Sequence, residues 1–166
     1  MDTTPLFEAI RAGDLAGVSR ILAARPEAAG ASDDNGLSAL TVAAYGHQWP
    51  IVDQILAAGP ELDVFEAAIV GDAERVGTLF DAAERERAVE AAAGAGDLPD
   101  PIDERSADGF TTLHLAARFG RTDVVRLLLA RGADPRALDE DILTAAELAE
   151  RAGHPEIAAA IRAAGG

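Results

Sequence analysis

A pattern that recurs along the chain restricts the possible folds more strongly than any other feature of this sequence. Thr111 is matched by Thr144 and Gly120 by Gly153, which gives a period of 144 − 111 = 33 residues. Three further stretches match this pattern or each other, so five repeat units fill the chain of 166 residues. A unit of this length cannot bury its own apolar faces, and units of this kind therefore stack into a solenoid with one continuous core.

Each repeat unit has the pattern of two helices joined by a tight turn. A hydroxyl residue is placed to cap the first helix by accepting a backbone N–H, in turn Thr4, Ser38, Thr111 and Thr144. A glycine is placed to end that helix in the left-handed conformation, in turn Gly13, Gly71, Gly120 and Gly153. Asp14 and Asp72 are placed to cap the second helix. The hydrophobic 49% of the chain is mainly alanine and leucine, with 4% aromatic residues, so we predict an all-α fold.

The fourth repeat unit carries the most complete version of the pattern, with the segments T-T-L-H-L-A-A-R-F-G, V-V-R-L-L-L and G-A-D. With these segments and the matching units, nearly the whole chain resembles the ankyrin-repeat family. The resemblance implies an all-α solenoid of about five helix-turn-helix units joined by hairpin loops, with a concave groove that binds other proteins and no catalysis. It also implies that His114, the fourth residue of T-T-L-H, makes a hydrogen bond between repeats.

The spacing of equivalent residues departs from the period at two junctions. Leu40 and Val64 are 64 − 40 = 24 residues apart, and Val64 and Leu113 are 113 − 64 = 49 apart. The short junction predicts a direct turn over residues 59–63, without a hairpin. The long junction predicts an insert that forms an extra or extended helix over residues 83–93 and then a loop, broken by Gly94, Gly96, Pro99 and Pro101. We expect one domain, 1–166, with approximate units 4–33, 34–61, 62–83, 106–138 and 139–166 and an insert at 84–105.

The resemblance implies that a partner protein contacts the loop tips and the ends of the first helices, together with the insert. The candidate partner-binding residues at these places are Arg11, Leu37, Tyr45, Ile69, Val70, Phe110, Arg118, Phe119 and Arg151. Aromatic residues beside an arginine are typical of interface hot spots. Two alternatives stay open. The insert covers the apolar residues among these candidates, or Ile69 and Val70 pack between repeats.

Charge and composition exclude several classes of function. The chain has 29 acidic and 14 basic residues, and the net charge of −15 disfavours nucleic acids and anionic membranes as partners. The same charge favours a basic protein partner. Cysteine is absent, which excludes disulfides and thiol chemistry. No secretory signal pattern is present, so we expect a protein in the cytoplasm. We also expect a monomer. Arginine without lysine favours a GC-rich bacterial source through codon usage.

A catalytic or metal-binding role finds little support in the pattern. His47, His114 and His154 belong to different turns and repeats, without the spacing of metal ligands, so we expect no metal and no cofactor. No phosphate loop or nucleophile motif occurs, and we expect no enzyme. The alternative is a small-molecule or catalytic pocket formed by the insert and the groove, with Asp100, Asp103 or His114 used for chemistry.

Overall fold

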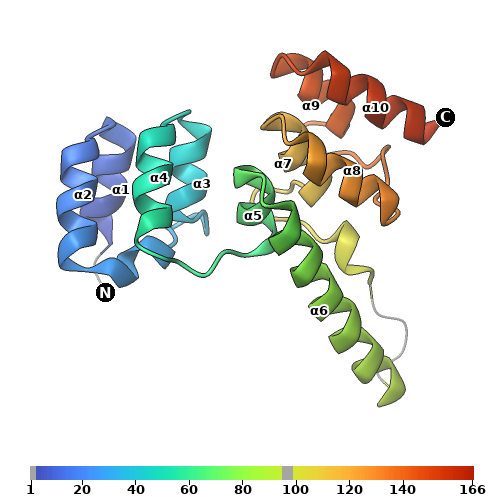
Figure 1. Ribbon diagram of the computed structural model, residues 1–166, viewed down its shortest axis with the longest axis horizontal. Coiled ribbons are helices and arrows are strands. Elements are labelled where there is room, and N and C mark those ends of the chain that lie inside the picture. The colour runs from blue at the N-terminus through green and yellow to red at the C-terminus, as the bar shows by residue number, and fades with distance from the viewer. Residues whose placement is uncertain (1–2, 95–98) are drawn as a thin grey trace. The chain divides into compact units, whose positions relative to one another are not determined.

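The computed structural model describes residues 3–94 and 99–166, and this part of the chain is helical (Figure 1). The prediction of an all-α fold is confirmed. The chain divides into two compact units, which are called here the N-terminal unit, Met1–Leu62, and the C-terminal unit, Asp63–Gly166. The expected assignment of 1–166 to one domain stays a prediction.

The N-terminal unit consists of two helix pairs and a short 3-10 helix. Its elements are α1 (Thr4–Ala12), α2 (Leu15–Ala24), η1 (Pro26–Gly30), α3 (Ala39–Tyr45) and α4 (Trp49–Ala57). α1 packs against α3 and α2 against α4, so the first helices of the two pairs form one layer and the second helices another. The core between the layers contains Leu6, Ile10, Val18, Leu40 and Ile55, all buried.

The C-terminal unit, taken by itself, has a two-layer arrangement of three helix pairs. Its elements are α5 (Val64–Val70), α6 (Ala73–Ala92), η2 (Pro101–Asp103), α7 (Thr112–Arg118), α8 (Thr122–Ala130), α9 (Ala145–Arg151) and α10 (Pro155–Gly165). The inner layer is α5, α7 and α9 and the outer layer is α6, α8 and α10. Apolar side chains of both layers form one buried cluster that includes Val76, Phe80, Leu113, Leu128 and Ile161.

Local sequence signals set the ends of most helices. The side chains of Ser38, Thr111 and Thr144 accept the N–H groups of Thr41, His114 and Glu147, and the three predicted caps are confirmed. The Asp14 and Asp72 carboxylates cap α2 and α6 as predicted. The prediction for Thr4 is wrong, because Thr4 is the first residue of α1 and Thr3 holds the N-cap position. The helix starts one residue earlier than expected because Pro5, which suits either of the first two helical positions, fits the second as well as the first.

The connections between repeats also follow the sequence. Hairpin loops close through isolated bridges between Ser32 and Ser38, Arg105 and Thr111, and Leu138 and Thr144. Residues 58–63, all described, form no such bridge between α4 and α5, as the shortened spacing predicts. The predicted extended helix is also present, because α6 continues to Ala92. Gly96 of the predicted loop lies outside the described residues.

Gly120 offers a test of how closely consecutive repeats pack. Its φ is +73°, and a Cβ atom built there would lie 2.6 Å from Cε1 of His154, in the next repeat. We expect Gly120→Ala to lower the free energy of unfolding by about 2 kcal/mol, since it adds a steric clash to the left-handed penalty. Gly132→Ala is the matched control, because Gly132 has φ +91° and open space around its Cβ position. Urea titrations of both variants measure the difference, and equal losses would contradict a contact with His154.

Candidate functional site

In the N-terminal unit, the candidate residues gather where the inner helices end beside the hairpin loop. Arg11 at the end of α1 forms an ion pair with Asp33 in the loop, with 2.7 Å between Nη2 and Oδ2. The same guanidinium lies 5.7 Å from the centroid of the Phe7 ring. Asp33 is nearly buried and accepts the backbone N–H of Leu37 as well, at 3.1 Å. Arg11 and Leu37 are thereby connected through one carboxylate, and Tyr45 is half-buried at the end of α3.

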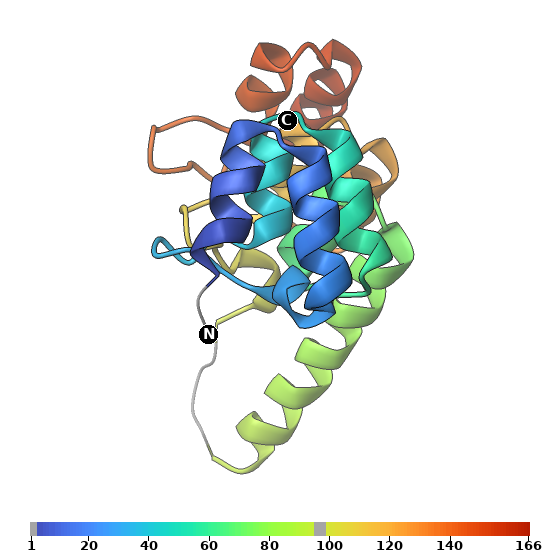
Figure 2. The same ribbon diagram turned by 90° about the vertical axis from the view of Figure 1, so that its left-hand side faces the viewer.

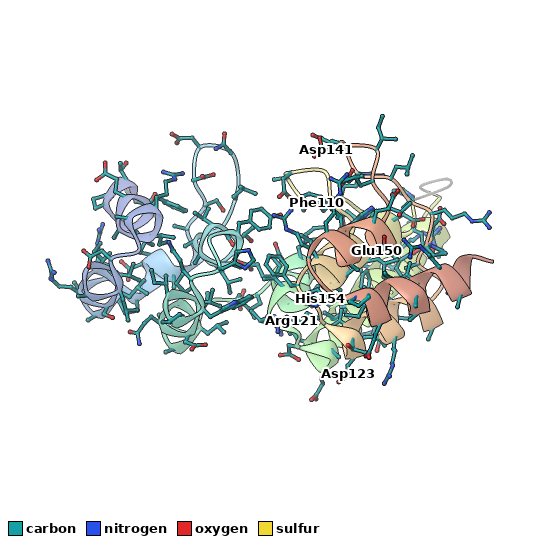
Figure 3. The ribbon with its side chains drawn as sticks, turned by 90° about the horizontal axis from the view of Figure 1, so that it is seen from above. Phe110, Arg121, Asp123, Asp141, Glu150 and His154 are labelled. Atoms are coloured by element: carbon teal, nitrogen blue, oxygen red, sulfur yellow. The ribbon has the colours of Figure 1, made fainter. Side chains whose placement is uncertain are left out.

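In the C-terminal unit, Phe110 and Arg118 form the best-defined pair among the candidates. Phe110 ends a hairpin loop and Arg118 ends α7, and both are half-buried. The Arg118 Cζ atom lies 5.9 Å from the centroid of the Phe110 ring, within the range of a cation–π contact. The Phe110 ring also packs near the His114 ring, with 6.2 Å between the two ring centroids. Phe110 and Asp141 lie on the loop side of this unit, and Asp123 lies on the opposite side (Figure 3).

The placement of Ile69 and Phe119 contradicts their prediction as surface residues. Ile69 is 0% exposed and Phe119 is 8% exposed, so neither offers surface to a partner. The sequence prediction placed Ile69 with Val70, and Arg118 with Phe119, on one surface. Consecutive residues near a helix end point about 100° apart, so one of each pair turns inward. For Ile69 this outcome favours the alternative of internal packing, whereas Val70 is half-buried and Arg151 is exposed.

Arg105 connects two consecutive hairpin loops of the C-terminal unit. Its Nη1 donates to the carbonyl of Gly109 at 2.6 Å, and its Nη2 donates to the carbonyl of Leu138 at 2.8 Å. Sequence reasoning missed this residue, because no local pattern shows that its side chain spans to a loop 33 residues away. The contact gives the loop that carries Phe110 a fixed position beside the next loop.

His114 is fully buried and makes the inter-repeat hydrogen bond that the resemblance implies. Its Nε2 lies 3.1 Å from the carbonyl oxygen of Leu143 in the next repeat, and its Nδ1 lies 2.7 Å from Oγ1 of Thr111. Because a carbonyl only accepts, Nε2 carries the proton and Nδ1 accepts from the hydroxyl. Burial lowers the pKa of His114 below 6.5 and keeps the ring neutral. Both ring nitrogens of His114 are engaged in structural hydrogen bonds. His114 is therefore unsuited to a role in the alternative small-molecule or catalytic pocket.

The insert forms a cleft of its own beside the second half of α6. The cleft has a volume of about 440 Å³ and is lined by Ala83, Glu86, Arg87, Glu90, Pro99, Asp100, Pro101, Asp103 and Glu104. Five of these side chains are carboxylates and one is basic. Asp100 and Asp103 therefore meet here, but His114 does not line the cleft. The alternative hypothesis of a small-molecule or catalytic pocket named all three residues as candidates for its chemistry.

Helix α6 is joined to α8 only through part of its length. Arg131 at the end of α8 forms ion pairs with Asp81 and Glu84, at 2.5 Å and 3.4 Å. The C-terminal part of α6 extends beyond α8 (Figure 1), and Figure 2 shows this part of the helix in a second view. This projecting part supplies one wall of the cleft.

The described residues contain no group of three or more His, Asp or Glu side chains placed to hold a metal ion. In the same part of the chain, no helix combines the length and the apolar character that spanning a bilayer requires.

Comparison with known proteins agrees with the repeat architecture. Residues 101–149 match the family described as ankyrin repeats (many copies). The chain is 44% identical over 54 residues to "Putative E3 ubiquitin-protein ligase XBAT34" of Arabidopsis thaliana, a match that covers 32% of this chain and 14% of that protein. It is 59% identical over 39 residues to "E3 ubiquitin-protein ligase hecd-1" of Caenorhabditis elegans, which covers 24% of this chain and 2% of that protein. Ankyrin repeats generally mediate protein–protein interaction and are not catalytic.

Proposed function

We propose that this ankyrin-repeat chain is a non-catalytic module that binds a partner protein through its hairpin loops and inner-helix ends. The observation that carries the proposal is the pair formed by Phe110 and Arg118, half-buried and in cation–π contact at 5.9 Å. An aromatic ring and an arginine that are already fixed lose little conformational entropy on binding. Arginine is also among the most frequent carriers of binding energy at interfaces, and phenylalanine is enriched at interfaces relative to the rest of the surface.

The surroundings of the pair support the same function. Val70 and Arg151 end the inner helices before and after α7 and keep surface on the C-terminal unit. Arg105 fixes the loop that carries Phe110, so this surface is preorganised. In the N-terminal unit, the Arg11–Asp33 ion pair and the half-buried Leu37 and Tyr45 supply the corresponding contacts.

The insert contributes a second contact in this proposal. Its cleft combines an apolar part, formed by Ala83, Pro99 and Pro101, with five carboxylates. Such a lining suits a partner segment with basic side chains, in agreement with the chain's net charge of −15. A cytoplasmic location and a monomeric state complete the proposal, and a sequence without cysteine is compatible with a reducing compartment.

We expect the double variant Phe110→Ala/Arg118→Ala to bind the partner at least about tenfold more weakly than the wild type. Proteins that the wild-type chain captures from a lysate of its source cells are identified by mass spectrometry, purified and titrated against each variant. Arg126→Ala is the matched control for charge, because Arg126 lies on α8 with 75% of its side chain exposed. Far-UV circular dichroism checks that the helices are intact. Unchanged affinity of the double variant would contradict the assignment of this surface.

A small-molecule site in the insert is the second candidate, because a cleft of about 440 Å³ has the size of a ligand pocket. The two candidate functions differ in the ligand that stabilises the folded chain on binding, which is a protein in the first and a small molecule in the second. If no protein binds, and if a panel of small metabolites raises the melting temperature in a way that Glu86→Gln/Glu90→Gln removes, this second function is favoured.

A further inference from the structure

Ile142 at the tip of the third hairpin loop has a backbone conformation that its side chain disfavours. Its φ is 61°, in the left-handed region, and the residue is 74% exposed. The equivalent positions of the other two hairpin loops hold Gly36, with φ 80°, and Gly109, with φ 82°. A β-branched residue is rare in this region because its Cβ substituents crowd the backbone. The chain therefore carries a strained, water-exposed isoleucine where its own repeats use glycine.

The loop holds Ile142 in this conformation through hydrogen bonds on both sides of the tip. The Asp139 N–H donates to the Leu143 carbonyl at 2.9 Å, and the Ile142 N–H donates to the Asp139 carbonyl at 3.2 Å. The Leu143 N–H in turn donates to Oδ1 of Asp139 at 2.8 Å, and Arg105 holds the carbonyl of Leu138. None of these bonds uses the Ile142 side chain. Folding of the hairpin therefore does not require isoleucine here, and strain that the fold does not need points to a role in function.

The neighbours of Ile142 indicate the chemistry of what binds it. Glu140 and Asp141 precede it and are exposed, and Leu138 at the base of the loop is 44% exposed. Figure 3 shows Asp141 at the outer end of this loop. Arg105 reaches the base of this loop, and its guanidinium donates to two carbonyls. The tip thus presents an apolar side chain beside two carboxylates.

We propose that Ile142 is an anchor that inserts into an apolar pocket of the partner protein, and that lysine or arginine residues border this pocket. The inference rests on the proposed function and adds the residue that anchors the partner. Burial of an exposed branched side chain supplies affinity, and the two carboxylates supply selectivity for a basic rim. The loop is preorganised by the bonds from Arg105 and Asp139, so little entropy is lost on docking.

The test uses the full chain with a photoreactive amino acid in place of Leu138, which is 44% exposed at the base of the loop, in a lysate of the source cells. This position leaves Ile142 and both carboxylates unchanged. The crosslinked protein is identified, its crosslinked peptide is sequenced, and the purified protein is titrated against the unlabelled variants. Ile142→Asn removes the apolar group but suits the left-handed conformation, whereas Ile142→Leu keeps an apolar group without the β-branch. We expect Ile142→Asn to weaken binding at least about tenfold while raising the melting temperature by about 2–4 °C. Ile142→Leu should stay within about threefold of the wild type.

The control variants separate this inference from the proposed function. If Phe110→Ala/Arg118→Ala weakens binding and Ile142→Asn does not, the module binds as proposed and the anchor is wrong. If no protein binds the wild type, both are wrong. A crosslinked peptide without lysine or arginine, or a crosslink to a second copy of this chain, would also overturn the assignment.

Discussion

Replacing Leu128 with alanine is expected to lower the free energy of unfolding of the C-terminal unit by about 3 kcal/mol, within a range of roughly 2–5 kcal/mol. Leu128 is 0% exposed and belongs to the cluster that joins the inner and outer helix layers. Val124 and Ile161 lie in the same cluster, one on α8 and one on α10. The loss combines the transfer free energy of the removed carbon atoms with the cavity that the rigid helix pairs leave unfilled.

Urea unfolding monitored by circular dichroism measures this change. Leu138→Ala is the control, because Leu138 is 44% exposed at the base of a hairpin and its loss should stay within about 0.5 kcal/mol. A change below about 1 kcal/mol for Leu128→Ala would mean that the helix pairs close over the cavity, and that the two layers are less tightly packed than described.

The second large effect is expected at His114. Its ring links Thr111 to the Leu143 carbonyl of the following repeat, and the residue is 0% exposed. His114→Ala leaves a buried carbonyl and a buried hydroxyl without this partner and opens a cavity, and we expect a loss of about 3 kcal/mol. His114→Gln keeps part of the volume and one amide donor, so it should lose less. Equal losses for the two variants would show that hydrogen bonding by this side chain contributes nothing.

His114 also predicts how stability depends on pH. Burial lowers its pKa in the folded chain below the 6.5 of the unfolded chain. Between these two values the unfolded chain binds more protons, so the free energy of unfolding rises with pH through this window. The contribution is complete above pH 6.5 and is lost as the pH falls through the folded-state pKa. Urea midpoints at pH 8, 6 and 5 measure the slope, which should be smaller in His114→Gln.

Urea titrations at pH 5 and above avoid a second pH dependence of stability, which comes from carboxylates that titrate at lower pH. Hydrogen bonds from Thr144 lower the pKa of Glu147, and a hydrogen bond from Arg162 lowers the pKa of Glu150. These carboxylates stabilise the fold above their unfolded value of 4.5 and lose that contribution as the pH falls below it. Measurements that stop at pH 5 therefore report the histidine. A slope in His114→Gln equal to that of the wild type would contradict the assignment.

The fold was predictable because it depends on local signals that repeat. The hydroxyl at Ser38 or Thr111 and the glycine at Gly120 act within one or two turns of their own helix. The surface was harder to predict. Family-derived positions placed Ile69 on the surface, whereas the angle between successive helix residues turns it inward. The 33-residue period aligns Ile142 with Gly109, but the sequence does not show that the loop keeps the left-handed backbone angle when isoleucine replaces glycine.

Long-range contacts set a second limit. Sequence reasoning placed the hairpin loops but not the arginine that connects two of them, because that contact spans two repeats. The alternative of a pocket named Asp100 and Asp103, which line the cleft of the insert, but it did not give the other walls of the cleft for the same reason. The helix at residues 83–93 was predicted, but not the wall formed opposite to it by residues 99–104.

The bridge made by Arg105 has a consequence for how this chain tolerates change. One planar guanidinium reaches the carbonyls of Gly109 and Leu138, so the distance between successive hairpins is matched to the width of that group. A lysine would preserve the charge but supply a single ammonium point instead of a fork. At this position, then, a substitution that is conservative in charge is not conservative in geometry, and the spacing of the loops constrains the choice of residue more than the electrostatics does.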